Sequence, residues 1–138
     1  MTSEAIQTFF DHYVDAFSRR DIDAVMSLWT FPATITTPAG SFVFDEPAFR
    51  TNTEALCRFY DRQGTVEARK RVSGIHELSP AVATVTTEDE LYDEEGSLIA
   101  AWRHGYVLRE TAQGIRAIVA VADAEIEGWA ARGTPLGS

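Results

Sequence analysis

The spacing of apolar residues predicts two helices at the start of the chain. A first set recurs at intervals of three and four residues, which places it on one face of an α-helix: Ile6, Phe9, Phe10, Tyr13, Val14 and Phe17. Asp21 suits the N-cap of a second helix, whose apolar stripe is Ile22, Val25, Met26 and Trp29. Pro32 cannot continue a helix, because its ring blocks the helical path and it lacks an N–H. We therefore expect the second helix to end near Thr30.

A short hairpin and a third helix are predicted next. Two β-prone segments, residues 33–36 and 41–44, flank the sequence Thr37-Pro38-Ala39-Gly40, where proline and glycine indicate a turn. Asp45-Glu46-Pro47 is typical of a helix start, with an acceptor side chain, an acidic first turn and an early proline. This helix is expected to end at Gly64.

From residue 65 onward the pattern changes to long strands. Segments rich in β-formers and separated by turn residues predict strands over residues 65–77, 81–92, 97–109 and 115–127. Short connections between consecutive strands require an antiparallel meander, and strands of this length must twist and curl. We therefore expect one α+β domain over residues 1–130, with three N-terminal helices packed on a strongly curved, mainly antiparallel sheet that encloses a pocket. Residues 131–138 are expected to form a flexible tail.

Composition narrows the classes of partner. The 138 residues carry a net charge of −9, which argues against binding to nucleic acid or to an anionic membrane. No apolar run approaches the ~20 residues of a membrane span, and we see no signal peptide, so we expect a cytoplasmic protein. The histidines lie on different elements without metal-ligand spacing, the chain has one cysteine, and no nucleotide-binding motif occurs. We expect neither a metal nor another cofactor.

The run from His12 to Trp29 resembles the opening of NTF2-like proteins, the group that includes SnoaL-like and ketosteroid-isomerase-like proteins. In that group a helix ends in a small-residue corner, which an Asp-apolar-Asp step and a second helix follow. Residues 33–40 look like the family's first hairpin, and the order of elements matches over nearly the whole chain. The resemblance implies a cone-shaped, cystatin-like α+β fold. It leaves the reaction open, because this fold hosts isomerases, dehydratases, cyclases, epoxide hydrolases and plain binding domains.

Comparison with ketosteroid isomerase implies roles for three positions. That enzyme uses a tyrosine and a protonated aspartic acid as oxyanion donors and an aspartate as general base. Tyr13 matches the first-helix tyrosine, and His104 aligns, within one residue, with the late-strand acid. Thr37 stands before Pro38 at the position of the base. A hydroxyl cannot abstract a proton at neutral pH as a carboxylate can, so steroid isomerisation is not expected.

Alternation along the third long strand places Trp102 and Tyr106 on one face with His104. Two aromatic rings beside an imidazole suit an apolar pocket with one polar handle. On the preceding strand we expect the face of Glu90 to join His104 and form a carboxylate–imidazole couple, although a β-bulge would reverse that face. The alternative is that Glu90 belongs to a solvated acidic strand end.

Further pocket candidates come from the second helix, the hairpin and the last strand. Asp123 is a candidate acid or substrate anchor near the mouth, and Val119 and Val121 share its face of the last strand. Trp29 is expected to wall the pocket, and Thr37 to lie beside it.

Two functions follow from these candidates and stay open. The first is cofactor-free proton-transfer chemistry of the isomerase, dehydratase or cyclase type on a small, largely apolar molecule, with His104 as acid/base, Tyr13 as donor, and Glu90 or Asp123 assisting. The second is a non-catalytic domain that binds an apolar or amphipathic ligand or a partner chain. By the family resemblance, we also expect a homodimer formed through the outer face of the sheet.

Overall fold

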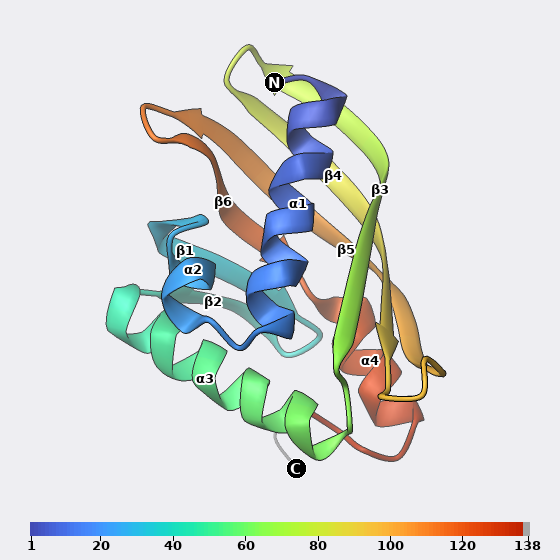
Figure 1. Ribbon diagram of the computed structural model, residues 1–138. Helices are drawn as coiled ribbons and strands as arrows, with labels where there is room; N and C mark the ends of the chain where they lie inside the picture. The colour runs from blue at the N-terminus through green and yellow to red at the C-terminus, as the bar shows by residue number, and fades with distance from the viewer. Residues whose placement is uncertain (137–138) are drawn as a thin grey trace.

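The computed structural model describes residues 1–136 and shows helices packed on one six-stranded sheet (Figure 1). The strand order is β2-β1-β6-β5-β4-β3, and every neighbouring pair is antiparallel except β1 and β6, which run parallel. The helices are α1 (Ser3–Ser18), α2 (Ile22–Met26), α3 (Glu46–Arg62) and α4 (Asp123–Ala131). The strands are β1 (Trp29–Thr37), β2 (Gly40–Phe44), β3 (Glu67–Ser79), β4 (Val82–Tyr92), β5 (Leu98–Thr111) and β6 (Gly114–Val121). The α+β fold, with a curved and mainly antiparallel sheet, is confirmed.

The N-terminal helices begin at the caps that the sequence predicts. Asp21 and Asp45 accept hydrogen bonds from the backbone N–H groups of Ala24 and Ala48, at 3.1 and 2.9 Å. Such side-chain acceptors satisfy amides that the first helical turn leaves without an intrahelical partner. In Figure 1, α1 lies across the curled sheet, while α3 lies near the β1–β2 hairpin. These helices cover the concave side of the sheet.

The second helix is shorter than predicted. It ends at Met26, and Trp29 already belongs to β1, where it lies opposite Ala117 of β6. The helical stripe of the sequence continues through Trp29, but pairing with a strand almost ninety positions away decides the conformation. Trp29 is nevertheless buried. The prediction of a helix at this residue was wrong, but the prediction that its ring faces the interior is correct.

Two bulges, one in β5 and one in β6, set which residues of β4 and β6 share the inner face of β5. Leu91 of β4 lies opposite Ala100 while Tyr92 lies opposite Leu98, so Ile99 is an extra residue in β5. In the same way, Val107 and Leu108 of β5 lie opposite Val119 and Ala117, so Ile118 is an extra residue in β6. Each extra residue reverses the alternation of faces relative to an unbroken register.

The last predicted strand is half helix. Residues 115–127 were expected to be extended, but β6 ends at Val121 and α4 begins at Asp123. Asp123 and Glu125 lie in the first turn of α4, where the helix dipole favours acids. Glu125 and Trp129, four residues apart, form the buried face of α4.

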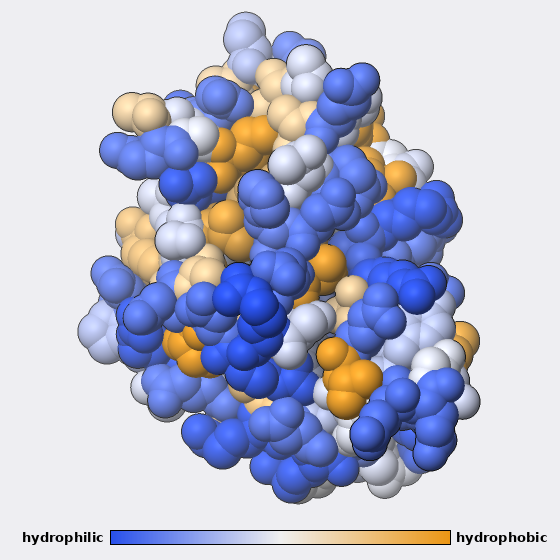
Figure 2. All heavy atoms as spheres, in the orientation of Figure 1, coloured by the Kyte–Doolittle hydropathy of each residue, from blue (hydrophilic) through white to orange (hydrophobic). Residues whose placement is uncertain are grey.

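The core lies between the helices and the concave face of the sheet, and most of the surface seen in Figure 2 is hydrophilic with hydrophobic patches between. Within residues 1–136, no helix combines the length and the apolar character that crossing a membrane requires. Of the predicted tail, residues 131–138, Ala131 still belongs to α4, and Leu136 packs against the core. Residues 137–138 lie outside the described part of the chain.

Candidate functional site

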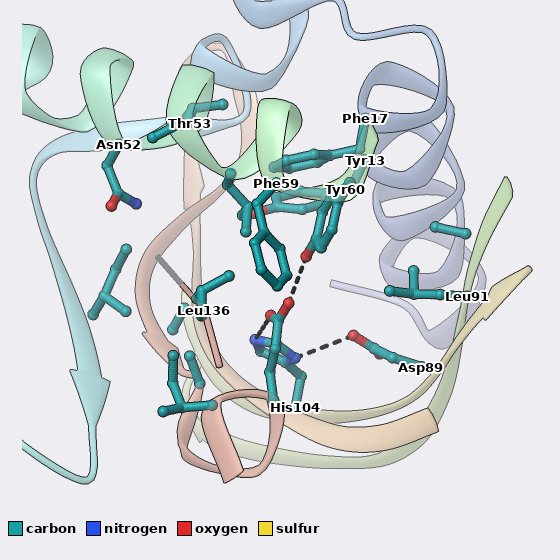
Figure 3. A pocket seen from close by; sticks show the side chains of 18 of the residues that line it. Tyr13, Phe17, Asn52, Thr53, Phe59, Tyr60, Asp89, Leu91, His104 and Leu136 are labelled. Carbon is teal, nitrogen blue, oxygen red and sulfur yellow. Dashed lines mark hydrogen bonds and ion pairs between the residues drawn. The ribbon is translucent and has the colours of Figure 1, made fainter. Parts of the chain in front are cut away.

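A cavity of about 540 Å³ lies between the concave face of the sheet and the helices (Figure 3). Its wall is mainly apolar and aromatic, with contributions from α1, α3, α4, all six strands and the end of the chain. Its volume falls within the ~300–1,000 Å³ of small-molecule sites. A cluster of two acids, a lysine and a histidine also lines it, from four different elements, each with a side chain at most 10% exposed: Lys70, Asp89, His104 and Glu125.

Asp89 is at the centre of the first part of this cluster. The bulge at Ile99 places Asp89 opposite Trp102, and Lys70 of β3 lies opposite Asp89 on the same face. One carboxylate oxygen accepts a hydrogen bond from Thr87 Oγ1 at 2.6 Å. The other forms an ion pair with Lys70 Nζ and lies 3.1 Å from His104 Nδ1. The His104 contact has the distance of an ion pair, but not the alignment of a hydrogen bond.

The charges around Asp89 determine its protonation. Burial alone would raise the pKa of Asp89, but Lys70 and His104 outweigh burial and lower the pKa to about 2. Asp89 is therefore ionised at neutral pH, although its side chain is only 6% exposed.

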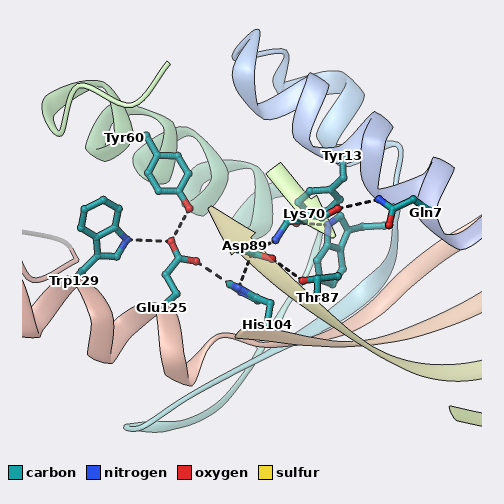
Figure 4. Close-up of polar contacts among 10 residues, drawn as sticks. Gln7, Tyr13, Tyr60, Lys70, Thr87, Asp89, His104, Glu125 and Trp129 are labelled. Atoms are coloured by element: carbon teal, nitrogen blue, oxygen red, sulfur yellow. Dashed lines mark hydrogen bonds and ion pairs between the residues drawn. The ribbon is translucent and has the colours of Figure 1, made fainter. Parts of the chain in front are cut away.

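Glu125 forms the second part of the cluster, on the other side of the imidazole (Figure 4). Its Oε2 accepts two hydrogen bonds, from Tyr60 OH at 2.6 Å and from Trp129 Nε1 at 3.1 Å. Its Oε1 lies 3.7 Å from His104 Nε2, which is too long for a direct hydrogen bond. One oxygen of Glu125 is thus held by two donors, while the other faces the ring across a gap.

This arrangement distinguishes the two nitrogens of His104. Nδ1 faces the ionised Asp89, which favours the tautomer that carries the proton on Nδ1 and leaves Nε2 with its lone pair. Nε2 and Glu125 Oε1 are then two basic atoms that face the same gap at the cavity wall. A carboxylate that orients a histidine whose far nitrogen exchanges protons is a common acid/base device.

The tyrosines of the cavity keep their protons. Burial, the nearby Tyr106 and, to a smaller extent, Glu125 raise the pKa of Tyr13, against the lowering effect of Lys70. Burial and the charges of Asp89 and Glu125 raise the pKa of Tyr106 well above its usual value. Tyr13 OH accepts a hydrogen bond from Trp29 Nε1 at 3.3 Å, and the Lys70 ammonium lies 5.5 and 5.1 Å from the Tyr13 and Tyr106 ring centres.

Several residues named from the sequence lie around this cavity. The structure places them on α1, β1 and β5: Tyr13, Trp29, Thr37, Trp102, His104 and Tyr106. His104 and Tyr106 stack with ring centres 5.4 Å apart. Thr37 Oγ1 accepts a hydrogen bond from the Ala39 N–H at 3.1 Å, within the hairpin turn.

Four predicted residues lie elsewhere. Glu90 is opposite Ala101, so it is on the other face of β4 from His104, and the expected Glu90–His104 pair is wrong because of the bulge at Ile99. The bulge at Ile118 likewise places Val119 opposite Val107 on the outer face, and Val121 lies opposite Gly105; Ala120 lines the cavity instead. Asp123 opens α4 outside the cavity lining, and its carboxylate accepts a hydrogen bond from Thr36 Oγ1 at 3.0 Å.

Three residues of the cluster were missed in the sequence. Asp89 is adjacent to the predicted Glu90, and only the bulge decides between them. Glu125 is separated from the predicted Asp123 by one residue, and the helix-forming sequence of residues 122–131 was the available signal. Lys70 is the only lysine among the twelve lysine and arginine residues. The composition singles it out, but nothing in the sequence indicates that it lies at the cavity. Within the described residues, no group of three His, Cys, Asp or Glu side chains is placed to hold a metal ion.

The chain belongs to the NTF2-like proteins, because a family model described as NTF2-like protein (DUF6841) matches residues 3–125. No curated protein matches the sequence. Solved structures with a similar fold include an NTF-2 like protein of unknown function from Shewanella oneidensis, with a TM-score of 0.68 and 14% identity over 88% of this chain and 98% of that one. A ketosteroid isomerase-like protein from Erwinia carotovora atroseptica has a TM-score of 0.64 and 18% identity, over 88% of this chain and 95% of that one.

A third similar structure is an NTF2-like protein with a cystatin-like fold from Novosphingobium aromaticivorans. Its TM-score is 0.67 and its identity 15%, over 95% of this chain and 86% of that one. At such identities the similarity establishes the fold, while the reaction has to be argued from the side chains of the site.

Proposed function

We propose that this protein is a cofactor-free acid/base enzyme that moves a proton on a small, largely apolar molecule bound in the cavity. The observation that carries the proposal is the gap between His104 Nε2 and Glu125 Oε1, 3.7 Å apart at the cavity wall. Asp89 and Lys70 support one side of this gap, and Tyr60 and Trp129 support the other. The class of reaction is that of isomerases and dehydratases, which begin by removing a proton next to a carbonyl group.

Each side chain has a stated part in the proposed step. His104 Nε2 removes a proton from the carbon beside the substrate carbonyl, and the electron pair of the broken C–H bond forms an enolate. Asp89 and Glu125 stabilise the imidazolium that forms, because they lie on opposite sides of the ring. The ring then returns a proton to the substrate, either at the same carbon, at another carbon, or at a leaving hydroxyl. Atoms and electrons balance without an oxidant or a reductant.

The free-energy cost of burying these four side chains supports a functional role. Taking a carboxylate or an ammonium out of water costs several kcal/mol, and an ion pair only partly recovers this. The side chains of Lys70, Asp89, His104 and Glu125 are 6–10% exposed. An apolar core would stabilise the fold at least as well, whereas titratable side chains clustered on the wall of a cavity are typical of active sites.

The non-catalytic alternative is a ligand-binding domain of the same fold. One observation favours it: Thr37, at the position of the ketosteroid isomerase base, has no carboxylate, and its hydroxyl is engaged in the turn. Under this alternative the cluster fixes the shape and polarity of the cavity but transfers no proton. The two functions therefore differ in whether a bound ketone exchanges its α-hydrogens.

Deuterium uptake by simple ketones tests the proposal. The protein is incubated in D₂O with 1-tetralone or 2-tetralone, and mass spectrometry follows exchange next to the carbonyl above the buffer rate. We expect exchange by the wild type and a loss of about 10²–10⁴-fold in His104→Gln, with a smaller loss in Glu125→Gln. Glu90→Gln, on the opposite face of β4, is the matched control and should keep the wild-type rate.

Two results would overturn the catalytic proposal. One is binding of the ketones without any exchange above buffer, which supports the non-catalytic alternative. The other is exchange that His104→Gln leaves unchanged, because the proton would then move through another group.

A further inference from the structure

Positive charge gathers at the opening of the cavity, although the protein as a whole is acidic. Among residues 1–136, six of the residues that line the cavity are exposed and therefore mark where it meets solvent: Phe42, Asn52, Ala55, Arg58, Arg62 and Arg69. Three of these six are arginines and none is an acid, in a chain with 21 acidic residues and 12 lysines and arginines. The acids of the lining, Asp89 and Glu125, are both buried. The charge at the opening is thus opposite in sign to that of the whole chain.

Four of these exposed residues form a row along α3, which we call the α3 rim: Asn52, Ala55, Arg58 and Arg62. They are spaced three, three and four residues apart, so successive members are neighbours on the helix surface. Figure 3 shows the side chain of Asn52 extending from α3 toward the cavity. One edge of the opening therefore carries an amide and two guanidinium groups.

Arg62 lies over an aromatic ring of the cavity wall. Its Cζ is 5.7 Å from the centre of the Phe59 ring, a distance at which an aromatic face attracts a cation. Phe59 is 1% exposed and lines the cavity, and its ring packs edge-on against Trp129 at 5.0 Å. Trp129 in turn donates to Glu125. Phe59 therefore connects the α3 rim to the side chains that hold Glu125.

The arginines at the opening differ in what their side chains contact. Arg69 Nε donates to Glu67 Oε1 at 3.3 Å, and its Cζ lies 4.6 Å from the ring centre of Tyr92. Within residues 1–136, no hydrogen bond or ion pair involves Arg58. Arg58 and Arg62 are four residues apart on the helix, where two like charges repel each other. An anion bound between them would relieve this repulsion.

We propose that the α3 rim binds an anionic group of the ligand, and that the ligands of this cavity are carboxylic acids with an apolar body. The inference rests on the proposed function, because it names the class of molecule that the same cavity binds. A planar guanidinium donates two parallel hydrogen bonds to a carboxylate, and the amide of Asn52 is a further donor. Inside the cavity, the ionised Asp89 repels a second anion. The carboxylate therefore stays at the opening, and the apolar body points inward.

A matched pair of ligands tests the inference. 4-Oxo-4-phenylbutanoate and its neutral amide, 4-oxo-4-phenylbutanamide, have the same size and the same ketone, but only the first carries a negative charge. Isothermal titration calorimetry at neutral pH measures both affinities. We expect the wild type to bind the carboxylate about five- to tenfold more tightly than the amide. This preference should shrink between about 20 mM and about 0.5 M NaCl, because salt screens exposed charges.

Substitutions on α3 identify the residues responsible. Arg58→Gln should lose part of the preference for the carboxylate, and Arg58→Gln/Arg62→Gln should lose all of it, with the affinity for the amide unchanged. Arg50→Gln removes the same charge from the same helix, but Arg50 does not line the cavity, so this control should keep the wild-type preference. No preference for the carboxylate in the wild type, or a preference that the double variant retains, would overturn the inference.

Deuterium exchange in the same two ligands separates this inference from the proposed function. If the carboxylate binds more tightly but exchanges no deuterium above the buffer rate, the assignment of the α3 rim stands and the catalytic function fails. If both ligands exchange deuterium through His104 but bind equally well, the catalytic function stands and the assignment of the α3 rim fails.

Discussion

Asp89 is a buried carboxylate whose charge depends on Lys70. The pKa of Asp89 lies at about 2 in the folded protein, against about 3.9 for an unperturbed aspartate. A carboxylate with a lowered pKa stabilises the folded state at pH values above its unfolded pKa. That contribution, about 2 kcal/mol, is lost as the pH falls from about 4 through 2. Part of the acid sensitivity of the protein should therefore come from this one residue.

Lys70→Met tests this dependence. Removing the ammonium leaves Asp89 buried without its main partner, and we expect a loss of about 3–5 kcal/mol in the free energy of unfolding at pH 7. The loss should shrink toward pH 3, because Asp89 then takes up a proton in the variant. Urea denaturation at pH 7, 4 and 3 measures both effects, with the exposed Arg71→Met on the same strand as the control.

A double variant separates the ion pair from simple packing. The double variant Lys70→Met/Asp89→Asn carries no charge at either position. No buried carboxylate is then left without its lysine, so part of the lost stability should return. Identical pH dependence of Lys70→Met and Arg71→Met would contradict the coupling of Asp89 to Lys70.

Between elements, Gln7 joins α1 to the edge strand β3. Its Nε2 donates to the Lys70 carbonyl at 2.9 Å, and its Oε1 accepts from the Val72 N–H at 2.9 Å. An edge strand has no neighbouring strand to satisfy these groups. The side-chain amide of Gln7 thus binds the backbone groups of the two residues that flank Arg71. It holds in place the strand that carries Lys70.

We expect Gln7→Leu to lower the free energy of unfolding by about 1–2 kcal/mol, because it leaves both backbone groups without their protein partner. Hydrogen exchange at the Val72 amide should accelerate as well. His12→Leu, an exposed polar-to-apolar change in the same helix, is the matched control. Unchanged exchange at Val72 would show that α1 does not protect the edge of the sheet.

The helices and the order of the strands are predictable because they follow local patterns. The stripe of α1 is predicted well: Ile6, Phe9, Phe10, Tyr13 and Phe17 are all buried. The faces of β4 and β6 are not predictable in this way, because one extra residue, in the neighbouring strand β5 for β4 and in the strand itself for β6, reverses them. Ile99 and Ile118 look like any other strand residues in the sequence. The site therefore contains Asp89 in place of Glu90 and Ala120 in place of Val119.

At the scale of the whole molecule, the bulges also determine what the outer face of the sheet carries. Val107 and Val119 lie opposite each other there, and Val121 lies opposite Gly105. On the other side of Gly105, Thr86 of β4 lies opposite it. Uncharged and mostly β-branched residues therefore follow one another across β4, β5 and β6. Val121 is 42% exposed. The valines that were expected in the cavity thus form an apolar patch on the opposite side of the sheet, where exposed apolar area favours contact with another chain.

We propose that the protein is a homodimer that buries this patch, as the family resemblance suggests. Light scattering coupled to size-exclusion chromatography at micromolar concentration should then give about twice the 15.3 kDa of one chain. Val121→Arg places a charge in the patch and should yield a monomer with unchanged circular dichroism, because the residue contributes little to the core. Val66→Arg, at a residue 50% exposed that precedes β3, is the control and should remain a dimer. A monomeric wild type would exclude the dimer, and a dimeric Val121→Arg would place the contact on another surface, since a buried unpaired charge weakens an interface strongly.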